Sequence, residues 1–208
     1  LTTALTLSLA ASAALAEVPQ SVADRLGKDL TPMGAEKAGT KAGVDSWGGK
    51  PIDGSNLLSG YDGGALPNPY AADKPLYTIT ASNAGEYDAV LTEGQKALLA
   101  TYPDTYKLNV YKSRRSCTYP DYVYKAAKRN ALVGKNVDGG SGVSEAIMSS
   151  PFPIPSSALE IVWNHTLRYR GNRIARDFNY AAPTQNGTYT PTDTRDEIVF
   201  DWSNPQFS

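Results

Sequence analysis

The sequence is poor in the two side chains that most often build disulfides and metal sites. It holds one cysteine, Cys117, and one histidine, His165. A single cysteine excludes an internal disulfide framework, so the stability of the fold must come from packing. A lone histidine without cysteine or aspartate at ligand spacing cannot build a zinc cluster. We therefore expect no metal and no cofactor.

Net charge and long apolar runs are also scarce. The chain has 20 lysines and arginines against 21 aspartates and glutamates, a formal net charge of -1. This balance gives no overall positive field that would recruit nucleic acid. After residue 16, no apolar run approaches the length of about 20 residues that crosses a bilayer. We expect neither a nucleic-acid partner nor a transmembrane segment.

Signatures of common catalytic sites are missing as well. The sequence has no G-x-S-x-G motif, which would mark the nucleophile of an α/β-hydrolase. Residues 139–142 read GGSG but lack the Lys-Ser/Thr pair of a phosphate-binding P-loop. Cys117 follows two arginines, yet a catalytic thiol also needs a base, and no base partner is evident. We expect the protein not to be an enzyme.

The start of the chain indicates export. Residues 1–16 read LTTALTLSLAASAALA, carry no charge and end in a small-x-small triplet. The run is too short to span a membrane and is followed by polar sequence, as at a signal-peptidase cleavage site. No basic segment precedes it, so we expect an incomplete signal peptide over residues 1–16 and a periplasmic protein. The alternative is a buried N-terminal helix, which the lack of a polar face disfavours.

Residues 17–75 predict a short helix followed by an irregular arm. Apolar residues recur at helical spacing within residues 17–30. Residues 31–75 are rich in Gly, Pro, Asn and Asp and show no sustained period, so they predict an extended segment that wraps over the surface or docks on a partner. The aromatic side chains expected to anchor it are Trp47, Tyr61 and Tyr70.

Residues 76–208 predict a mixture of helices and strands. A helix is expected between Pro120 and Gly134, and an Asn-Gly pair at 186–187 is typical of a hairpin turn. Alternating apolar residues predict strands near 106–110 and 198–202. Residues 139–142 are expected to form a loop, and a helix is expected to end at Gly171. The capping-box pairs expected to open helices are Asn83 with Glu86, Thr92 with Gln95, and Ser157 with Glu160.

Four stretches of the chain resemble a family of exported Gram-negative proteins, the domain of unknown function 1329 family. Its members are often described as outer-membrane lipoprotein-sorting proteins. The stretches are RLGKDLTPMGAEKAG (25–39), YPDTYKLNVYKSRR (102–115), YPDYVYKAAKRNA (119–131) and PFPIPSSALEIVWNHTLRYRG (151–171).

The resemblance implies an α+β fold similar to the lipoprotein carriers LolA and LolB. Such a fold is a strongly curved antiparallel sheet, an incomplete barrel, with helices on the concave face over an apolar cavity for acyl chains. Family members are commonly about double this length. The resemblance therefore implies that residues 76–208 are the N-terminal part of a lipid-carrier-like domain, truncated at its C-terminus.

Two functions follow as expectations. The first is a periplasmic carrier or sorting protein for a lipid or another hydrophobic small molecule, acting near the outer membrane. The alternative is a non-enzymatic structural or assembly subunit that docks on an outer-membrane protein through residues 31–75.

The candidate lipid contacts are large apolar side chains of the last helix and the strands that follow. Burying an acyl chain on them would contribute about 0.8 kcal/mol per CH₂. An equally consistent interpretation is that they pack sheet against helix. The candidates are Leu159, Val162, Trp163, Phe178, Ile198, Phe200 and Trp202. His165 and Arg168, one helical turn apart, are candidate contacts for a lipid headgroup, with a solvated surface junction as the alternative.

Overall fold

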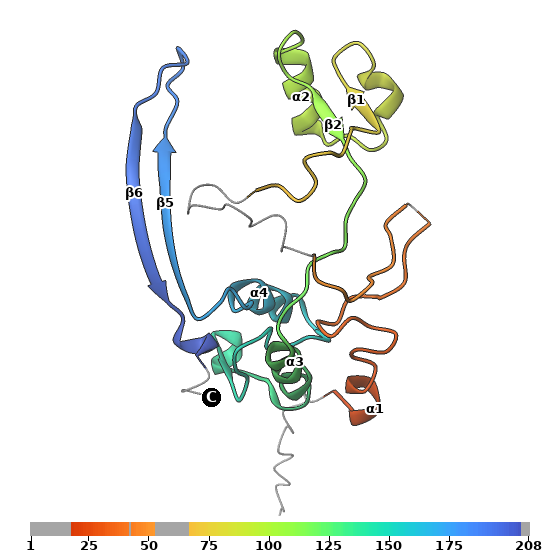
Figure 1. Ribbon diagram of the computed structural model, residues 1–208, viewed down its shortest axis with the longest axis vertical. Helices are drawn as coiled ribbons and strands as arrows, with labels where there is room; N and C mark the ends of the chain where they lie inside the picture. The colour runs from red at the N-terminus through yellow and green to blue at the C-terminus, as the bar shows by residue number, and fades with distance from the viewer. Residues whose placement is uncertain (1–17, 42, 53–66, 205–208) are drawn as a thin grey trace, which may run out of the picture. The chain divides into compact units, whose positions relative to one another are not determined.

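The computed structural model describes residues 18–41, 43–52 and 67–204 (Figure 1). The predicted signal peptide and Tyr61 lie outside the described residues. The fold class is α+β, as predicted, with short helices and short antiparallel ladders. The chain divides into two compact units, one formed by the residues before 37 and after 118, the other by Lys37–Thr118.

The second unit holds a small core between a two-stranded ladder and one helix. Strands β1 (Tyr77–Ile79) and β2 (Leu108–Val110) pair antiparallel, and helix α2 (Glu93–Thr101) lies between them in sequence. A 3-10 helix, η1 (Ala84–Tyr87), precedes α2. Three residues form this core: Ile79, Leu91 and Leu99.

The predicted capping box at the start of α2 is confirmed. The backbone N–H of Gln95 donates to Thr92 Oγ1 at 3.3 Å, and the backbone N–H of Thr92 donates to Gln95 Oε1 at 2.9 Å. These reciprocal bonds satisfy two donors that a helix N-terminus otherwise leaves unpaired.

The irregular arm is fastened to its own unit. The guanidinium of Arg115 donates to the carbonyl oxygens of Ala38 and Asp45 at 3.1 and 3.3 Å, and the indole N–H of Trp47 donates to the Cys117 carbonyl at 3.0 Å. Arg114 lies over the ring of Tyr70, 4.9 Å from its centroid, and pairs with Asp73. Two of the predicted anchors, Trp47 and Tyr70, therefore bind the segment that follows β2.

The first unit is organised around helix α3 (Asp121–Val133). Its predicted inner face is confirmed, because all four apolar side chains are buried: Val123, Ala126, Ala127 and Ala131. The helix follows Pro120 and its C-cap is Gly134, as predicted. The short helix α1 (Gln20–Ala23) packs on α3 through Ala23, which contacts Ala131 together with Leu26 and Leu30.

A buried asparagine joins α3 to the loop over residues 145–151. The Asn130 side chain is 1% exposed; its Nδ2 donates to the Ile147 carbonyl at 2.8 Å and its Oδ1 accepts from the Ile147 N–H at 3.0 Å. Glu145 and Met148 of this loop have left-handed φ angles of 64° and 60°. Such conformations cost about 1–3 kcal/mol each and persist only where the surroundings hold them. The hydrogen bonds of Asn130 help to keep the loop in these conformations.

The rest of the first unit consists of two hairpins and one helix. Strands β3 (Lys135–Val137) and β4 (Gly142–Ser144) form a short hairpin with a 3-10 turn, η2 (Asp138–Gly140). Helix α4 (Ala158–Thr166) precedes the long hairpin of β5 (Arg173–Ala181) and β6 (Pro191–Val199), which ends in a 3-10 turn, η3 (Asp201–Ser203). Figure 1 shows this hairpin as a long curved ribbon.

The strands form three separate two-stranded ladders. Within the described residues, no ladder gains a third strand and no helix packs broadly on either face of the β5–β6 ladder. A continuous curved sheet with helices on its concave face is therefore not seen in this part of the chain. The α+β class holds, and the barrel-like arrangement stays a hypothesis.

Two sequence predictions about helix length are wrong. The helix expected over residues 17–30 is a single turn that ends at Ala23. The chain then continues in turns, in which Gly27 adopts a φ of 84° and its N–H bonds to the Leu30 carbonyl. The helix expected to run to Gly171 ends at Thr166. There the Leu167 carbonyl accepts a hydrogen bond from the indole of Trp202, a distant contact that sequence spacing cannot show.

Three smaller predictions also need correction. Residues 139–141 form the connecting turn of the β3–β4 hairpin, as expected for a loop, but Gly142 already belongs to β4. The strand expected to begin at residue 106 begins at Leu108. The Asn83 side chain does not cap a helix, because its Oδ1 accepts from the Thr80 N–H at 2.7 Å and its Nδ2 donates to the Thr78 carbonyl at 3.1 Å.

Candidate functional site

Helix α4 is anchored through polar side chains. Glu160 is 5% exposed, and its carboxylate accepts from the Ser156 N–H at 2.5 Å and from the Ser156 hydroxyl at 3.0 Å. One turn on, Asn164 bonds both backbone groups of Phe152, accepting from its N–H at 2.8 Å and donating to its carbonyl at 2.6 Å. Residues four apart share a helix face. The side of α4 that meets the protein is therefore partly polar.

The capping of α4 follows from the same arrangement. Ser157 Oγ accepts from the Glu160 N–H at 3.3 Å, which is half of the predicted capping box. The other half is missing because the Glu160 carboxylate turns to Ser156 and, at 3.4 Å, to the amide of Asn136. The capping pattern located Glu160 in the sequence, but it gave no sign that the carboxylate is buried.

The outward side of α4 is apolar. Leu159, Ile161 and Val162 are 40%, 58% and 57% exposed. Burying such side chains contributes about 1.5–3 kcal/mol each, so a helix usually turns them inward. Helix α4 has the opposite arrangement: its polar groups face the protein and its aliphatic groups face outward. Exposed apolar surface of this kind is typical of a binding surface.

Trp163 and Leu167 lie between these two sides and are half-buried. The indole N–H of Trp163 donates to the Gly140 carbonyl at 3.0 Å, which ties α4 to the β3–β4 turn. A Cβ built on Gly140 would come within 2.1 Å of Leu159 Cδ2, so Leu159 covers this glycine. Trp163 thus fixes the position of the helix as well as contributing to its surface.

One face of the β5–β6 hairpin continues the apolar character. The register pairs Ile174 with Ile198 and Phe178 with Thr194. Phe178 packs edge-on against Tyr180 at a centroid distance of 5.0 Å. The residues on this face alternate with those on the other, as strand geometry requires. The large apolar members of this face are Ile174, Phe178, Tyr180, Ile198 and, just past the strand, Phe200.

Arginines flank the aromatic rings of this hairpin face. The guanidinium carbon of Arg176 lies 5.4 Å from the centroid of Phe178, and that of Arg170 lies 4.5 Å from the centroid of Phe200. Arg176 also pairs with Asp196 across the ladder, and this hydrogen bond holds the pKa of the Asp196 carboxyl below its ordinary value. The face therefore combines aliphatic and aromatic surface with cationic groups, a combination that suits an amphiphile.

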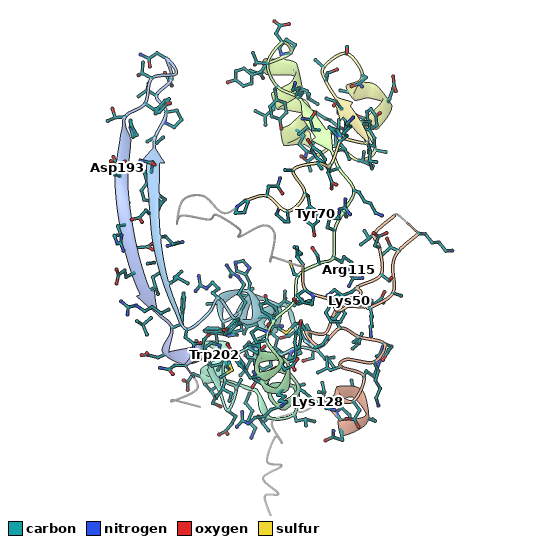
Figure 2. All side chains as sticks on the ribbon, in the orientation of Figure 1. Lys50, Tyr70, Arg115, Lys128, Asp193 and Trp202 are labelled. Atoms are coloured by element: carbon teal, nitrogen blue, oxygen red, sulfur yellow. The ribbon has the colours of Figure 1, made fainter. Side chains whose placement is uncertain are left out.

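The opposite hairpin face is charged. Arg173 pairs with Glu197 at 2.9 Å, and Arg195 lies 3.4 Å from Asp177. Asp193 on β6 accepts a hydrogen bond from Asn179 (Figure 2). The hairpin thus has one apolar and one charged face. We call the outward side of α4 and the apolar face of the hairpin together the apolar surface.

Trp202 connects the hairpin to the rest of the first unit. It lies at the foot of the hairpin, in η3 (Figure 2). Its indole N–H donates to the Leu167 carbonyl at 2.9 Å, and its own carbonyl accepts from the Met148 N–H at 2.9 Å. Trp202 is half-buried, and its indole N–H and its carbonyl are both engaged in these hydrogen bonds.

The two candidate headgroup contacts are both exposed. The guanidinium of Arg168 donates to the backbone carbonyl of His165, so the two residues meet through the main chain. In the part of the chain that the structure describes, neither side chain has a carboxylate partner.

Residues 18–41, 43–52 and 67–204 contain no group of three His, Cys, Asp or Glu side chains arranged to hold a metal ion. Over the same residues, no helix has the length and apolar character needed to cross a bilayer. Cys117 is exposed and not part of a disulfide.

Comparison with known proteins adds one family and one relative. The family model described as "Protein of unknown function (DUF1329)" matches residues 78–208. The chain is 46% identical over 197 residues to the uncharacterized protein PA3922 of Pseudomonas aeruginosa, covering 94% of this chain and 43% of that relative. The chain therefore spans less than half the length of this relative. No solved structure matches the chain. Because the family model covers more than half of the sequence, the chain belongs to the family of proteins of unknown function 1329.

Proposed function

We propose that the protein carries or sorts lipids or other lipophiles in the periplasm, near the outer membrane. The observation that carries this proposal is helix α4, which buries Glu160, bonds Phe152 through the half-buried Asn164, and exposes Leu159, Ile161 and Val162. A helix held by polar bonds on its inner side keeps its aliphatic side available without losing its anchor.

The hairpin supports the same proposal. Its apolar face presents aromatic and aliphatic side chains next to arginines, which suits an acyl chain and a polar or anionic head. In the full-length protein, further strands would extend this ladder toward the curved, incomplete barrel of the LolA and LolB type. That arrangement is part of the proposal.

The periplasmic location rests on the sequence. The uncharged run over residues 1–16 with its small-x-small end is typical of the end of a secretory signal peptide. A carrier needs an aqueous compartment between two membranes, and the periplasm is that compartment.

A titration with a fluorescent fatty acid tests the carrier function. The full-length protein should bind the probe, and replacing Ile161 and Val162 together by serine should weaken binding at least tenfold, because each side chain contributes more than 1.4 kcal/mol when buried. Both residues are exposed, so the variant should fold. Val90→Ser, at a valine in the second unit that is 72% exposed, is the matched control and should bind like the wild type. Absence of binding by the wild type would refute the carrier function.

The alternative, docking on an outer-membrane protein through residues 31–75, has less support. Trp47 and Tyr70 make hydrogen bonds and ring contacts within their own unit. A docking arm would have to release these contacts or use other side chains. Loss of an outer-membrane partner on replacing arm residues, together with no lipid binding, would favour this alternative.

A further inference from the structure

A second surface of the first unit has the features of a lipid-binding groove. It runs between the loop after α1 and the outward side of α3 and has a volume of about 270 Å³. No part of the apolar surface contributes to it. The residues that line it are Leu26, Gly27, Pro32, Asp121, Tyr124, Lys125 and Lys128.

The floor of this α1–α3 groove is apolar. Leu26 and Pro32 form one wall, and the ring of Tyr124 forms part of the other. The Tyr124 hydroxyl accepts a hydrogen bond from the Tyr119 N–H at 2.7 Å, so its polar end is already engaged. Gly27 adds no side chain, and a Cβ placed there would meet no atom within 4 Å. The groove is therefore open beside Gly27.

The rim of the groove is positively charged. Lys125 and Lys128 are three residues apart on α3 and lie on the same side of the helix. Lys128 bonds Asp24 at 3.0 Å, and this bond is the main cause that holds the pKa of the Asp24 carboxyl below its ordinary value. Figure 2 shows Lys128 on α3. The ammonium of Lys128 has three N–H donors, so it can still donate to a ligand while it bonds Asp24.

Lys125 is the free cation of the rim. It is exposed, and no carboxylate among the described residues pairs with it. The acidic groups near the groove are Asp24, which Lys128 neutralises, and Asp121, in the first turn of α3 where the helix dipole favours a negative charge. Lys28 also acts on Asp24 from the loop. Two lysines and one aspartate line the groove itself, so its lining carries an excess positive charge.

We propose that the α1–α3 groove binds an anionic amphiphile, with the acyl chain against Leu26, Pro32 and Tyr124 and the head at Lys125 and Lys128. The head is a carboxylate or a phosphate monoester, since either pairs with two ammonium groups. An uncharged or cationic head would leave the Lys125 charge without a partner. This inference goes beyond the carrier function because it assigns a second site and a ligand charge, although it rests on the same class of ligand.

Probes that differ only in the head test the groove. The full-length protein is titrated with palmitate, its methyl ester and hexadecyl phosphate at low salt. Palmitate or hexadecyl phosphate should bind at least tenfold more tightly than the ester, and the stronger of the two identifies the head. Lys125→Met, and the double variant with Lys128→Met, should reduce this preference at least fivefold without weakening binding of the ester. Lys107→Met, at an exposed lysine of the second unit, should change nothing.

The outcomes separate this inference from the carrier function. If the ester and the anions bind equally, or if the lysine variants leave the preference intact, the groove assignment is wrong while the carrier function stands. If no probe binds the wild type, both are wrong. If Lys125→Met alone reduces the preference for anionic probes, the result supports the groove assignment. This variant leaves the Lys128–Asp24 pair intact, so loss of that pair cannot explain the result.

Discussion

At the scale of single residues, buried and half-buried polar side chains tie irregular segments to the helices. Asn130, Glu160 and Asn164 each bond the backbone of a segment that has no regular structure. A buried polar group without a partner costs about 1–3 kcal/mol, so each of these side chains constrains both itself and the loop it binds. The contacts of Asn130 and Asn164 reach backbone 17 and 12 residues away, which residue type and spacing do not reveal.

Replacing Asn130 by alanine should destabilise the full-length protein by roughly 2–4 kcal/mol, because the Ile147 N–H and nearby carbonyls would lose their buried partners. Urea unfolding followed by tryptophan fluorescence measures the free energy of unfolding. Asn179→Ala, on the exposed hairpin face, is the control and should change it by less than about 0.5 kcal/mol. Equal effects of the two substitutions would contradict this role of Asn130.

A tyrosine pair predicts a pH effect. Burial, and then the hydrogen bond with Tyr122, raise the pKa of Tyr169 to about 12. In the unfolded chain the hydroxyl loses its proton near pH 10, so between about pH 10 and 12 the folded state holds more protons and stability falls as pH rises. The stability at pH 9 should therefore exceed that at pH 11.

Phenylalanine variants isolate this effect. The fall in urea midpoint between pH 9 and pH 11 should be smaller in Tyr169→Phe than in the wild type, because the variant lacks the titrating hydroxyl. Tyr189→Phe, at a tyrosine that is 63% exposed, should keep the wild-type fall. An unchanged fall in Tyr169→Phe would show that Tyr169 does not titrate differently in the folded protein.

At the scale of elements, the packing of α4 on the β3–β4 turn fixes where the apolar surface lies. Gly140 has a φ of 100°, and its position below Leu159 leaves no room for a Cβ. Gly140→Ala should therefore destabilise the protein by about 2–4 kcal/mol, from backbone strain and overpacking. Gly139→Ala is the matched control: its φ is 66° but a Cβ there meets nothing, so only strain of about 1–2 kcal/mol applies.

Thermal unfolding of both variants checks this packing. A larger loss for Gly140→Ala is expected, together with weaker binding of a fatty-acid probe if α4 moves. Equal losses would mean that Leu159 yields without cost, and that α4 is not fixed by this contact.

The sequence predicted several elements that depend on local signals. Thr92 and Gln95 form their capping box, and the alanines of α3 face inward, because both depend on neighbours within one or two turns. The end of α4 and the orientation of its apolar side chains were not predictable. The end of α4 depends on the indole of Trp202, which bonds the Leu167 carbonyl from 35 residues away. The orientation of the helix depends on Asn164 bonding Phe152 and on the burial of the Glu160 carboxylate.

The candidate site shows the same division. The sequence located the apolar residues of α4 and the hairpin, and it placed Phe178 and Ile198 on strands, where they lie. The strand expected near 198–202 ends at Val199, so Phe200 and Trp202 lie beyond it. It gave no sign that Leu159 and Val162 would be exposed while Glu160 is buried. The α1–α3 groove was not foreseen either, because it needs the loop after α1 to lie beside α3.

At the scale of the whole molecule, a periplasmic carrier must be exported. The protein should be cleaved after the ALA triplet, so that the mature form begins at Glu17. Terminal sequencing of the full-length protein from a periplasmic extract measures this directly. A mature protein that retains residues 1–16 would contradict the cleavage, and absence of the protein from the periplasmic extract would contradict the periplasmic assignment.

The central claim is that the full-length protein holds a lipid. Native mass spectrometry of the protein purified from a periplasmic extract, without detergent, measures the mass of the protein with whatever it retains. We expect peaks heavier than the mature chain by the mass of one or more lipids, which collisional activation removes. Ile161→Ser with Val162→Ser should reduce these peaks, and Val90→Ser should not. A wild-type spectrum that shows only the bare mature chain, from protein that is folded by circular dichroism, would contradict the claim.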